Sequence, residues 1–260
     1  MRNEFAKIIT ELSVVKKDIV LLAGDIGNRL FDNFKKNNPE RFYNCGVAEA
    51  NMTGVASGLA SCGFKPVTYT ITPFNTARCF EQIRLDICYP NLPIIIVGTG
   101  SGLSYASLGA THHSMEDISI LKTLPNLQII CPADKKEVRE AFIKAYESNK
   151  PTYIRLGKKG EPLIHKKKPN FQIGKSIFLK KGNDVALLGV GNALSIAAKC
   201  EEELFKKKIK CDLISFHTPK PLDKKLLTNL FKSDKLIAII EEHGLIGGVG
   251  SSVLEWANEN

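Results

Sequence analysis

The sequence predicts an α/β protein of two domains, a larger one built on a parallel sheet and a smaller one after it. Three observations support this prediction. Strand-like runs alternate with helical patterns, the runs are continuously apolar, and a stretch of Lys, Gly, Pro and Asn interrupts the pattern after residue 156. Continuously apolar strands that alternate with helices are typical of a parallel sheet covered on both faces.

The first domain is predicted over residues 1–160. An amphipathic helix opens it, because four apolar residues recur there at helical spacing: Phe5, Ile8, Ile9 and Leu12. Six strands are expected after it, at 19–23, 42–47, 66–71, 92–97, 127–131 and 152–156. Helices are expected between the strands, at 29–37, 50–62, 77–88, 118–124 and 135–148. Gly63 and Pro125 supply the stop signals for the second and fourth of these helices.

Residues 161–175 are predicted to form a linker, because the apolar periodicity is lost there. A second, smaller α/β domain is predicted over residues 176–260. Its expected strands lie at 185–190, 211–216 and 236–241, and its expected helices at 193–205, 224–231 and 246–257.

The composition argues against several classes of protein. The net charge is +9, but the lysines are scattered or fall in short runs at segment ends, without a basic and aromatic stripe. A solvated surface is therefore favoured over nucleic-acid binding, and phosphorylated small molecules remain compatible with the charge. No apolar run approaches the roughly 20 residues of a membrane span, and no signal peptide precedes the first helix. These features predict a cytoplasmic protein without membrane contact.

The seven cysteines are an odd number with no Cys-x-x-Cys pair, and most lie in apolar runs. Buried free thiols are therefore favoured over disulfides, and nothing supports a zinc site. His112 and His113 stand near Glu116 and Asp117, but adjacent side chains point in different directions, so no metal site is predicted there.

Four segments carry the chemistry of the first domain. Residues 45–51 read Cys-Gly-Val-Ala-Glu-Ala-Asn and predict a strand end, a turn and a helix start, with Glu49 in the first helical turn. Taken alone, this glutamate would be explained by the helix dipole. After it come Thr-Pro-Phe to Phe-Glu-Gln at 72–82, Gly-Ala-Thr-His-His at 109–113, and Leu-Pro-Asn to Pro-Ala-Asp at 124–134.

Together these segments resemble the pyrimidine-binding domain of thiamine-diphosphate enzymes, with the motifs in that family's order. The resemblance covers nearly the whole chain and is closest to transketolases split into two polypeptides, of which this chain is similar to the second. It implies a pyrimidine-binding domain at 1–160 and a transketolase C-terminal domain at 176–260. The latter is expected to be incomplete, because family members usually continue for one more strand and helix.

The resemblance assigns contacts with the cofactor. Thiamine diphosphate must lose a poorly acidic proton from its thiazolium carbon, and the imino form of its own pyrimidine amine removes that proton. A carboxylate that shares a proton with the pyrimidine nitrogen stabilises this form, and Glu49 matches that catalytic residue. Phe74 and Phe80 match the aromatic wall beside the pyrimidine, although both would also serve as core residues. Asp25 matches a residue near the thiazolium.

The resemblance also assigns contacts with the substrate. His112 matches a histidine that lies beside the thiazolium and hydrogen-bonds substrate oxygens, which makes it a second catalytic residue. Lys158 matches an arginine that binds the substrate phosphate, and Arg155, near the end of the same strand, is predicted to bind substrate as well. Leu108 and Gly100 depart from the family, which usually has an aspartate and a histidine there. Because both changes remove polar contacts, we hypothesise a modified, branched or nucleotide-linked sugar.

A partner chain is implied as well. Transketolases hold the diphosphate through Mg²⁺ with a Gly-Asp-Gly segment and a later Asn, and no such segment occurs here. The Mg²⁺ is therefore expected on an N-terminal, diphosphate-binding transketolase subunit, in a heterotetramer or at least a dimer. The implied activity is transfer of a two-carbon ketol unit between phosphorylated or modified sugars.

Two alternatives stay open. Beta subunits of 2-oxoacid dehydrogenases share this two-domain plan, although the Pro-Ala-Asp and Thr-His-His segments favour transketolase. The other alternative is a non-catalytic scaffold whose site has decayed, and the joint presence of Glu49, Phe74 and His112 argues against it.

Overall fold

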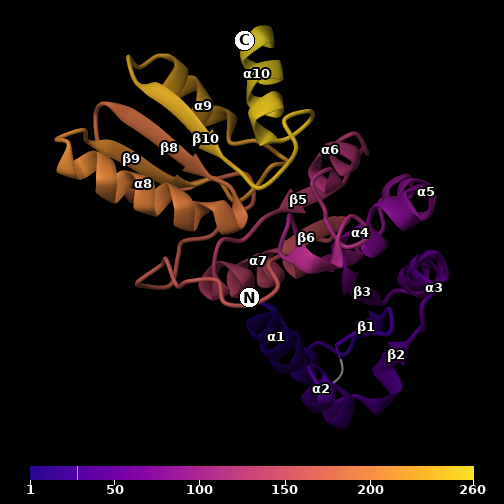
Figure 1. The fold of residues 1–260 in the computed structure, drawn as a ribbon. Coiled ribbons are helices and arrows are strands. Elements are labelled where there is room, and N and C mark those ends of the chain that lie inside the picture. Colours follow the sequence, from indigo (N-terminus) through magenta and orange to yellow (C-terminus); the bar gives the residue numbers. More distant parts are fainter. Residues whose placement is uncertain (28) are drawn as a thin grey trace.

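The computed structural model describes residues 1–27 and 29–260, which form two sheets flanked by helices (Figure 1). The first sheet has six parallel strands in the order β2-β1-β3-β4-β6-β5. The second has four strands in the order β10-β8-β9-β7, and β7 runs antiparallel to β9. The two-domain α/β class expected from the sequence is confirmed.

The first sheet consists of β1 (Ile19–Ala23), β2 (Phe42–Asn44), β3 (Lys65–Ile71), β4 (Ile95–Thr99), β5 (Gln128–Ile130) and β6 (Thr152–Leu156). Its longer helices are α1 (Arg2–Val15), α3 (Glu49–Ser61) and α7 (Lys135–Ser148). Shorter ones are α2 (Asp32–Asn37), α4 (Thr72–Asn75), α5 (Phe80–Gln82), α6 (Asp117–Lys122), η1 (Pro39–Arg41), η2 (Ala77–Cys79), η3 (Ile83–Cys88) and η4 (Ala106–Leu108).

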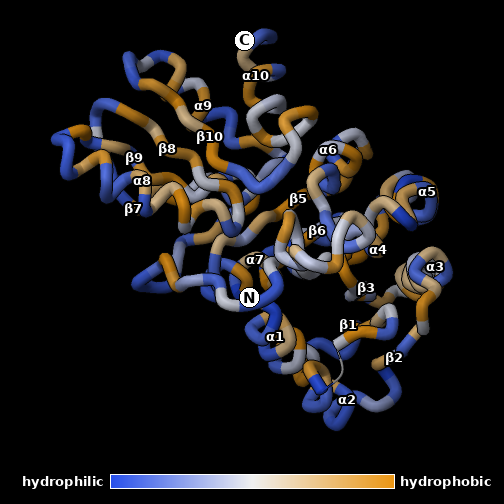
Figure 2. Tube along the Cα trace, in the orientation of Figure 1, coloured by the Kyte–Doolittle hydropathy of each residue, from blue (hydrophilic) through white to orange (hydrophobic). Residues whose placement is uncertain are grey.

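Alternate residues of the buried strands enter two different cores. On one face, Leu21 of β1 lies in a cluster with Phe5 of α1 and Phe142 of α7. On the other face, Leu22 lies in a cluster with Met52 of α3. Figure 2 shows the apolar residues along the strands and the hydrophilic ones along the outer helix α2. This double burial explains why the strands read as continuous apolar runs.

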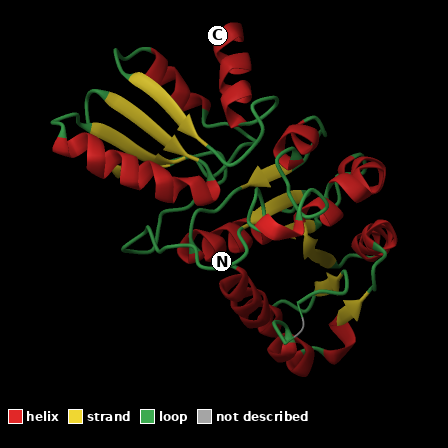
Figure 3. Cartoon of the chain, in the orientation of Figure 1, coloured by secondary structure: helices red, strands yellow, loops and turns green. Residues whose placement is uncertain are grey.

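The second sheet consists of β7 (Ile177–Lys180), β8 (Val185–Gly189), β9 (Cys211–Ser215) and β10 (Leu236–Ile240), with α8 (Leu194–Lys206), α9 (Lys224–Phe231), α10 (Val249–Glu259) and the short turn η5 (Gly191–Ala193) (Figure 3). Leu187 packs in a cluster with Leu194 of α8. Leu188 instead joins Leu227 of α9 in the cluster that also holds Met52 of the first domain. The two domains therefore share one continuous core.

The structure differs from the prediction in three places that matter for the fold. Strand β7 is additional: it is an edge strand with alternating half-buried and exposed residues, whereas only three strands were expected in this domain. The helix expected over 77–88 divides into η2, α5 and the π-helical η3. The strand expected over 42–47 ends at Asn44, because the chain turns at Gly46, whose φ is +67°.

Within the described residues, no helix combines the length and the apolarity that a bilayer crossing requires. All seven cysteines are free thiols, and four of them are buried: Cys79, Cys88, Cys131 and Cys211.

Candidate active site

The carboxyl ends of the parallel strands bring the predicted site residues to one edge of the first sheet. Asp25 follows β1, Glu49 follows the turn after β2, and Phe74 follows β3. His112 lies in the long connection after β4, and Lys158 comes two residues after β6. This edge is where open α/β folds bind their ligands.

Glu49 is the first residue of α3, and its carboxylate is almost fully buried, with 2% of the side chain exposed. The short β2 and the turn at Gly46 place it there, and Asn44 Oδ1 fixes that turn by accepting a hydrogen bond from Gly46 N at 3.0 Å. Opposite the glutamate, Gly24 directly follows β1, and an added Cβ there would lie 3.3 Å from Glu49 Cγ. The absence of a side chain at Gly24 thus lets the carboxylate sit against the sheet.

Arg78 is the direct partner of Glu49, and the sequence did not predict this role. Its Nη1 donates to Glu49 Oε2 at 2.7 Å. The same guanidinium lies over the Phe74 ring, with Cζ 4.2 Å from the ring centroid. The signal in the sequence was an arginine between the two aromatic residues of the predicted pocket, Phe74 and Phe80.

Phe80 packs against the hydrophobic core that Met52 and Ile83 belong to, and it is half-buried. This position agrees with its interpretation as a core residue, and a contact with the cofactor stays a prediction.

Aromatic contacts continue from Phe74 towards the connection after β4. The Phe74 and His112 rings are 5.2 Å apart, and the His112 and Tyr105 rings are 5.5 Å apart. Thr111 Oγ1 lies 2.8 Å from His112 Nδ1 and orients the imidazole. His113 turns away and contacts the Ala106 carbonyl through Nε2 at 2.9 Å. Only the first of the two adjacent histidines therefore joins this row of side chains.

Lys158 completes the row. Its Nζ lies 4.3 Å from the centroid of the Tyr105 ring, and the residue is half-buried. Tyr105 also fills the space beside Gly100, where an added Cβ would come within 1.9 Å of the ring. Four predicted residues, Glu49, Phe74, His112 and Lys158, are thus connected by two that were not predicted, Arg78 and Tyr105.

Arg155 uses its guanidinium within the protein. The residue is 4% exposed, Nε donates to Asp117 Oδ2 at 2.7 Å, and Nη2 donates to the carbonyls of Ser114 and Glu242 at 3.0 and 2.9 Å. Burial alone would raise the pKa of Asp117, but the charge and hydrogen bond of Arg155 outweigh it and lower that pKa. This geometry does not support the prediction that Arg155 binds substrate.

Asp25 is exposed and has a φ of +51°. Its backbone N donates to Asn44 Oδ1 at 3.2 Å, and Asn44 Nδ2 returns a hydrogen bond to Asp25 Oδ1 at 3.0 Å. The carboxylate is therefore held at the edge of the sheet, between the ends of β1 and β2.

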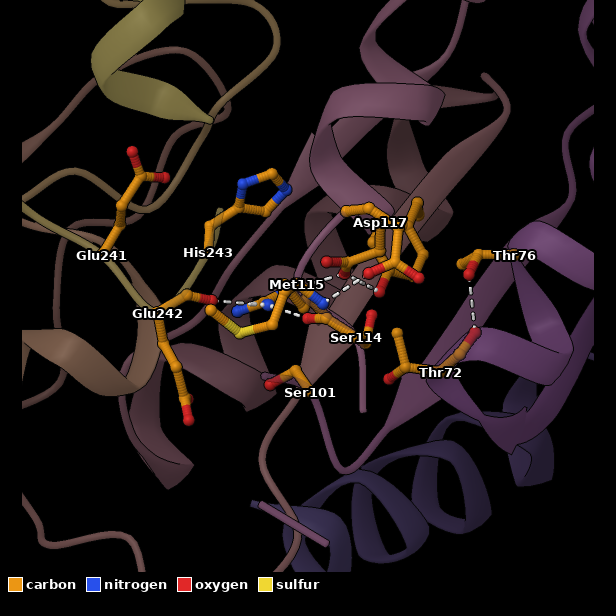
Figure 4. A network of polar contacts seen from close by, with 12 residues as sticks. Thr72, Thr76, Ser101, Ser114, Met115, Asp117, Glu241, Glu242 and His243 are labelled. Atoms are coloured by element: carbon orange, nitrogen blue, oxygen red, sulfur yellow. Dashed lines mark hydrogen bonds and ion pairs between the residues drawn. The ribbon is translucent and has the colours of Figure 1, made fainter. Parts of the chain in front are cut away.

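A loop of the second domain reaches the connection that carries His112 (Figure 4). Glu242 Oε1 accepts a hydrogen bond from Leu103 N at 2.9 Å, and Gly244 N donates to the Met115 carbonyl at 2.7 Å. His243 is 9% exposed and lies beside Ser119, whose N is 3.4 Å from Nε2. Both ends of the connection are thus tied to the second domain.

No group of three or more His, Cys, Asp or Glu side chains is placed to hold a metal ion in residues 1–27 and 29–260.

Comparison with known proteins agrees with this architecture. Residues 1–161 match the family model for the transketolase pyrimidine binding domain, and residues 174–260 match the transketolase C-terminal domain. The chain is 31% identical to a subunit of the apulose-4-phosphate transketolase of Phocaeicola vulgatus, over 100% of this chain and 84% of the relative. It is 32% identical to the 6-deoxy-6-sulfo-D-fructose transketolase subunit SqwH of Clostridium sp., over 100% of this chain and 81% of the relative.

A solved structure described as a split gene transketolase in an inactive beta4 tetramer is also similar. It superposes with a TM-score of 0.91 at 35% sequence identity, over 100% of this chain and 84% of that one. These matches define a protein of the transketolase type, a family whose members depend on thiamine diphosphate. The chain belongs to the transketolase family and corresponds to the subunit that carries the pyrimidine-binding and C-terminal domains.

Proposed function

We propose that this chain binds the pyrimidine half of thiamine diphosphate and catalyses two-carbon ketol transfer between sugars together with a second subunit. The observation that carries the proposal is the buried carboxylate of Glu49 at the ligand-binding edge of the sheet, with the Phe74 ring within reach of the same guanidinium. Thiamine diphosphate, when bound, supplies the carbon nucleophile that such a transfer requires.

The donor set of this edge fits a flat, basic heterocycle. Glu49 offers one oxygen for a proton shared with a ring nitrogen, and the low exposure of its side chain strengthens such a hydrogen bond. Phe74 offers a face on which a flat cation already stacks. We place the diphosphate and Mg²⁺ on the partner chain, because this sequence has no Gly-Asp-Gly segment of the kind expected to hold them.

The chain's own residues have separable roles in this proposal. Glu49 would share a proton with the heterocycle through its Oε2 oxygen. His112, oriented by Thr111, donates or accepts a hydrogen bond at Nε2 towards substrate oxygens. Lys158 lies at the far end of the row from Glu49 and offers a single positive charge for an anionic group of the substrate.

The proposed substrates are modified or branched sugars rather than the common linear pair. Leu108 is 52% exposed and offers no polar group, and Gly100 is covered by Tyr105. The relatives' names specify apulose 4-phosphate and 6-deoxy-6-sulfo-D-fructose, which agrees with an anionic substrate that is not a standard one. Efficient turnover of xylulose 5-phosphate with ribose 5-phosphate would contradict this part of the proposal.

The assembly is proposed to be a heterotetramer with two copies of each subunit. Two relatives are named as subunits, and the similar solved structure is an inactive tetramer. Both descriptions support an enzyme whose activity needs a different partner chain.

The test compares the tagged wild-type chain with Glu49→Gln, each isolated from its own cells with the subunits that copurify. Native mass spectrometry is expected to show a second, different subunit and bound thiamine diphosphate with Mg²⁺ in the wild type. Turnover of the variant should fall by about 10²–10⁴-fold, because the amide cannot share the proton. Glu81→Gln is the matched control, since Glu81 is 55% exposed and pairs with Arg84 on the surface.

Two results would overturn the proposal. Wild-type turnover of Glu49→Gln would remove the carboxylate from the mechanism. A wild-type homodimer without cofactor or second subunit would favour the scaffold alternative and leave Glu49 as a helix-start carboxylate.

A further inference from the structure

We infer that Arg78 is a further residue of the cofactor site, and that loading the cofactor is an exchange in which Arg78 releases Glu49. The inference rests on the proposed function. The Glu49 carboxylate and the Phe74 ring are the two groups proposed to bind the flat heterocycle, and together they form the corner of the site. The guanidinium of Arg78 occupies both, at 2.7 Å from the carboxylate and 4.2 Å from the ring centroid.

The exposed fractions of the two side chains indicate that Arg78, and not Glu49, is the one free to move. The side chain of Glu49 is 2% exposed, whereas that of Arg78 is 44% exposed. The backbone of Glu49 is held in place, because α3 begins at Glu49 and the Glu49 carbonyl accepts a hydrogen bond from Thr53 Oγ1 at 2.9 Å. Arg78 instead stands on the short turn η2, between α4 and α5. A ligand that approaches Glu49 Oε2 from solvent therefore meets the guanidinium first.

The exchange has a physical reason on both sides. A buried carboxylate without a partner is costly, so the empty site is stabilised by a cation on Glu49. A heterocycle that shares a proton with the same oxygen replaces that cation, and Glu49 is paired before and after loading. Because the competent form of the site is the one with Arg78 swung away, the apparent affinity for the cofactor is reduced by the fraction of time that Arg78 is bound.

The Phe74 ring is a second group for which Arg78 and the heterocycle of the cofactor compete. The guanidinium lies over the Phe74 ring, with Cζ 4.2 Å from its centroid, and the same ring makes a T-shaped contact with His112 at 5.2 Å between centroids. Releasing Arg78 uncovers both the carboxylate and the Phe74 ring at once. One side-chain movement therefore converts the closed corner into one with a free acceptor and a free aromatic surface.

The test is Arg78→Met in the complex isolated from its own cells, with thiamine diphosphate and Mg²⁺ as the probe. Methionine keeps an apolar chain over Phe74 but removes the charge. We expect the cofactor to associate about three- to tenfold faster and its dissociation constant to fall by a similar factor, because the ion pair is partly solvent-exposed. Stopped-flow fluorescence and equilibrium dialysis give both quantities without an activity assay.

The controls isolate the ion pair. Arg84→Met removes a 48% exposed arginine that pairs with Glu81 and should leave cofactor binding unchanged. In a Glu49→Gln background, Arg78→Met should have no further effect on the association rate, since its partner charge is gone. Added KCl should raise the association rate of the wild type relative to that of Arg78→Met, because salt screens the ion pair in the wild type alone, whereas its effect on the anionic cofactor is common to both proteins.

The outcomes separate this inference from the proposed function. Equal or weaker cofactor binding by Arg78→Met overturns the exchange, even where Glu49→Gln abolishes turnover and so supports the proposed function. Cofactor binding by Arg78→Met but not by the wild type supports the exchange. Binding by neither complex overturns both.

Discussion

Tyr105 accounts for Gly100, one of the two positions at which this site departs from the sugar-phosphate transketolases it resembles. A side chain at position 100 would collide with the Tyr105 ring, because the added Cβ lies 1.9 Å from it. Gly100 and Tyr105 are therefore coupled: a histidine at 100 needs a different residue or a different ring position at 105. In place of a polar side chain at 100, the site has an aromatic ring held between Lys158 and His112.

A second residue, His165, makes a pH-dependent contact between the segment that follows β6 and helix α7. Its Nε2 lies 2.6 Å from Glu137 Oε1, which also accepts a hydrogen bond from Ser215 Oγ at 2.6 Å. Burial alone would lower the pKa of His165, but the hydrogen bond and charge of Glu137, helped by Asp134, raise it above its ordinary value. The protonated imidazole therefore stabilises the folded chain.

We predict that His165→Gln costs about 1–3 kcal/mol of unfolding free energy in mildly acidic solution. Because the folded-state pKa is raised, the stabilisation is fully present below the unfolded pKa of about 6.5 and is lost as pH rises through the folded pKa. Urea unfolding of both proteins across this range measures the difference. The pKa of nearby His217 is lowered by burial, but His217 is present in both proteins and largely cancels. A difference that does not change with pH would contradict the prediction.

At the scale of elements, the sequence predicted best where burial determines the pattern. The strands β1, β4 and β6 are buried along their whole length. The bounds predicted from their apolar runs differ from the observed bounds by no more than three residues at either end. Strand β7 has no such signal, since an edge strand buries only alternate residues. The helix expected over 77–88 keeps its apolar periodicity although its hydrogen bonding changes to η2, α5 and η3, which periodicity does not report.

The candidate site shows the same limit. The sequence assigned Glu49, Phe74 and His112 through segments that resemble those of a known family, and Lys158 through its match to that family's arginine. It did not connect Arg155 with Asp117, which is 38 residues away in the chain, because long-range pairs leave no local pattern. The interpretation of Arg155 as a substrate ligand followed from its place in β6 alone.

Over the whole molecule, the shared core makes the second domain a support for the site. The Glu242 carboxylate accepts a hydrogen bond from Leu103 N, and the Glu242 carbonyl accepts one from Arg155 Nη2, both of the first domain. Gly102 permits this approach, because a Cβ there would lie 2.2 Å from Glu242 Cδ. The connection that carries Tyr105 and His112 is thus held from outside its own domain.

We predict that Glu242→Ala raises the KM for the sugar while leaving the dissociation constant of the cofactor within about twofold. The change removes the hydrogen bond between the Glu242 carboxylate and Leu103 N, and a bond of this charged kind is worth about 1.5–3 kcal/mol. Its loss makes the connection after β4 more mobile near Leu103, whereas the surroundings of Glu49 keep their contacts. Glu242→Gln keeps an acceptor oxygen and should restore most of the wild-type KM. Steady-state kinetics and equilibrium dialysis on the assembled complex measure the two constants.

Glu241→Ala is the matched control for this prediction. The Glu241 carboxylate accepts from Val249 N and Gly250 N at 2.8 and 2.9 Å, so all of its contacts stay inside the second domain. Its removal should lower the unfolding free energy by about 1–3 kcal/mol without changing the KM. An equal rise in KM for Glu241→Ala would mean that general destabilisation of the second domain, and not the contact from Glu242 to Leu103, reaches the site.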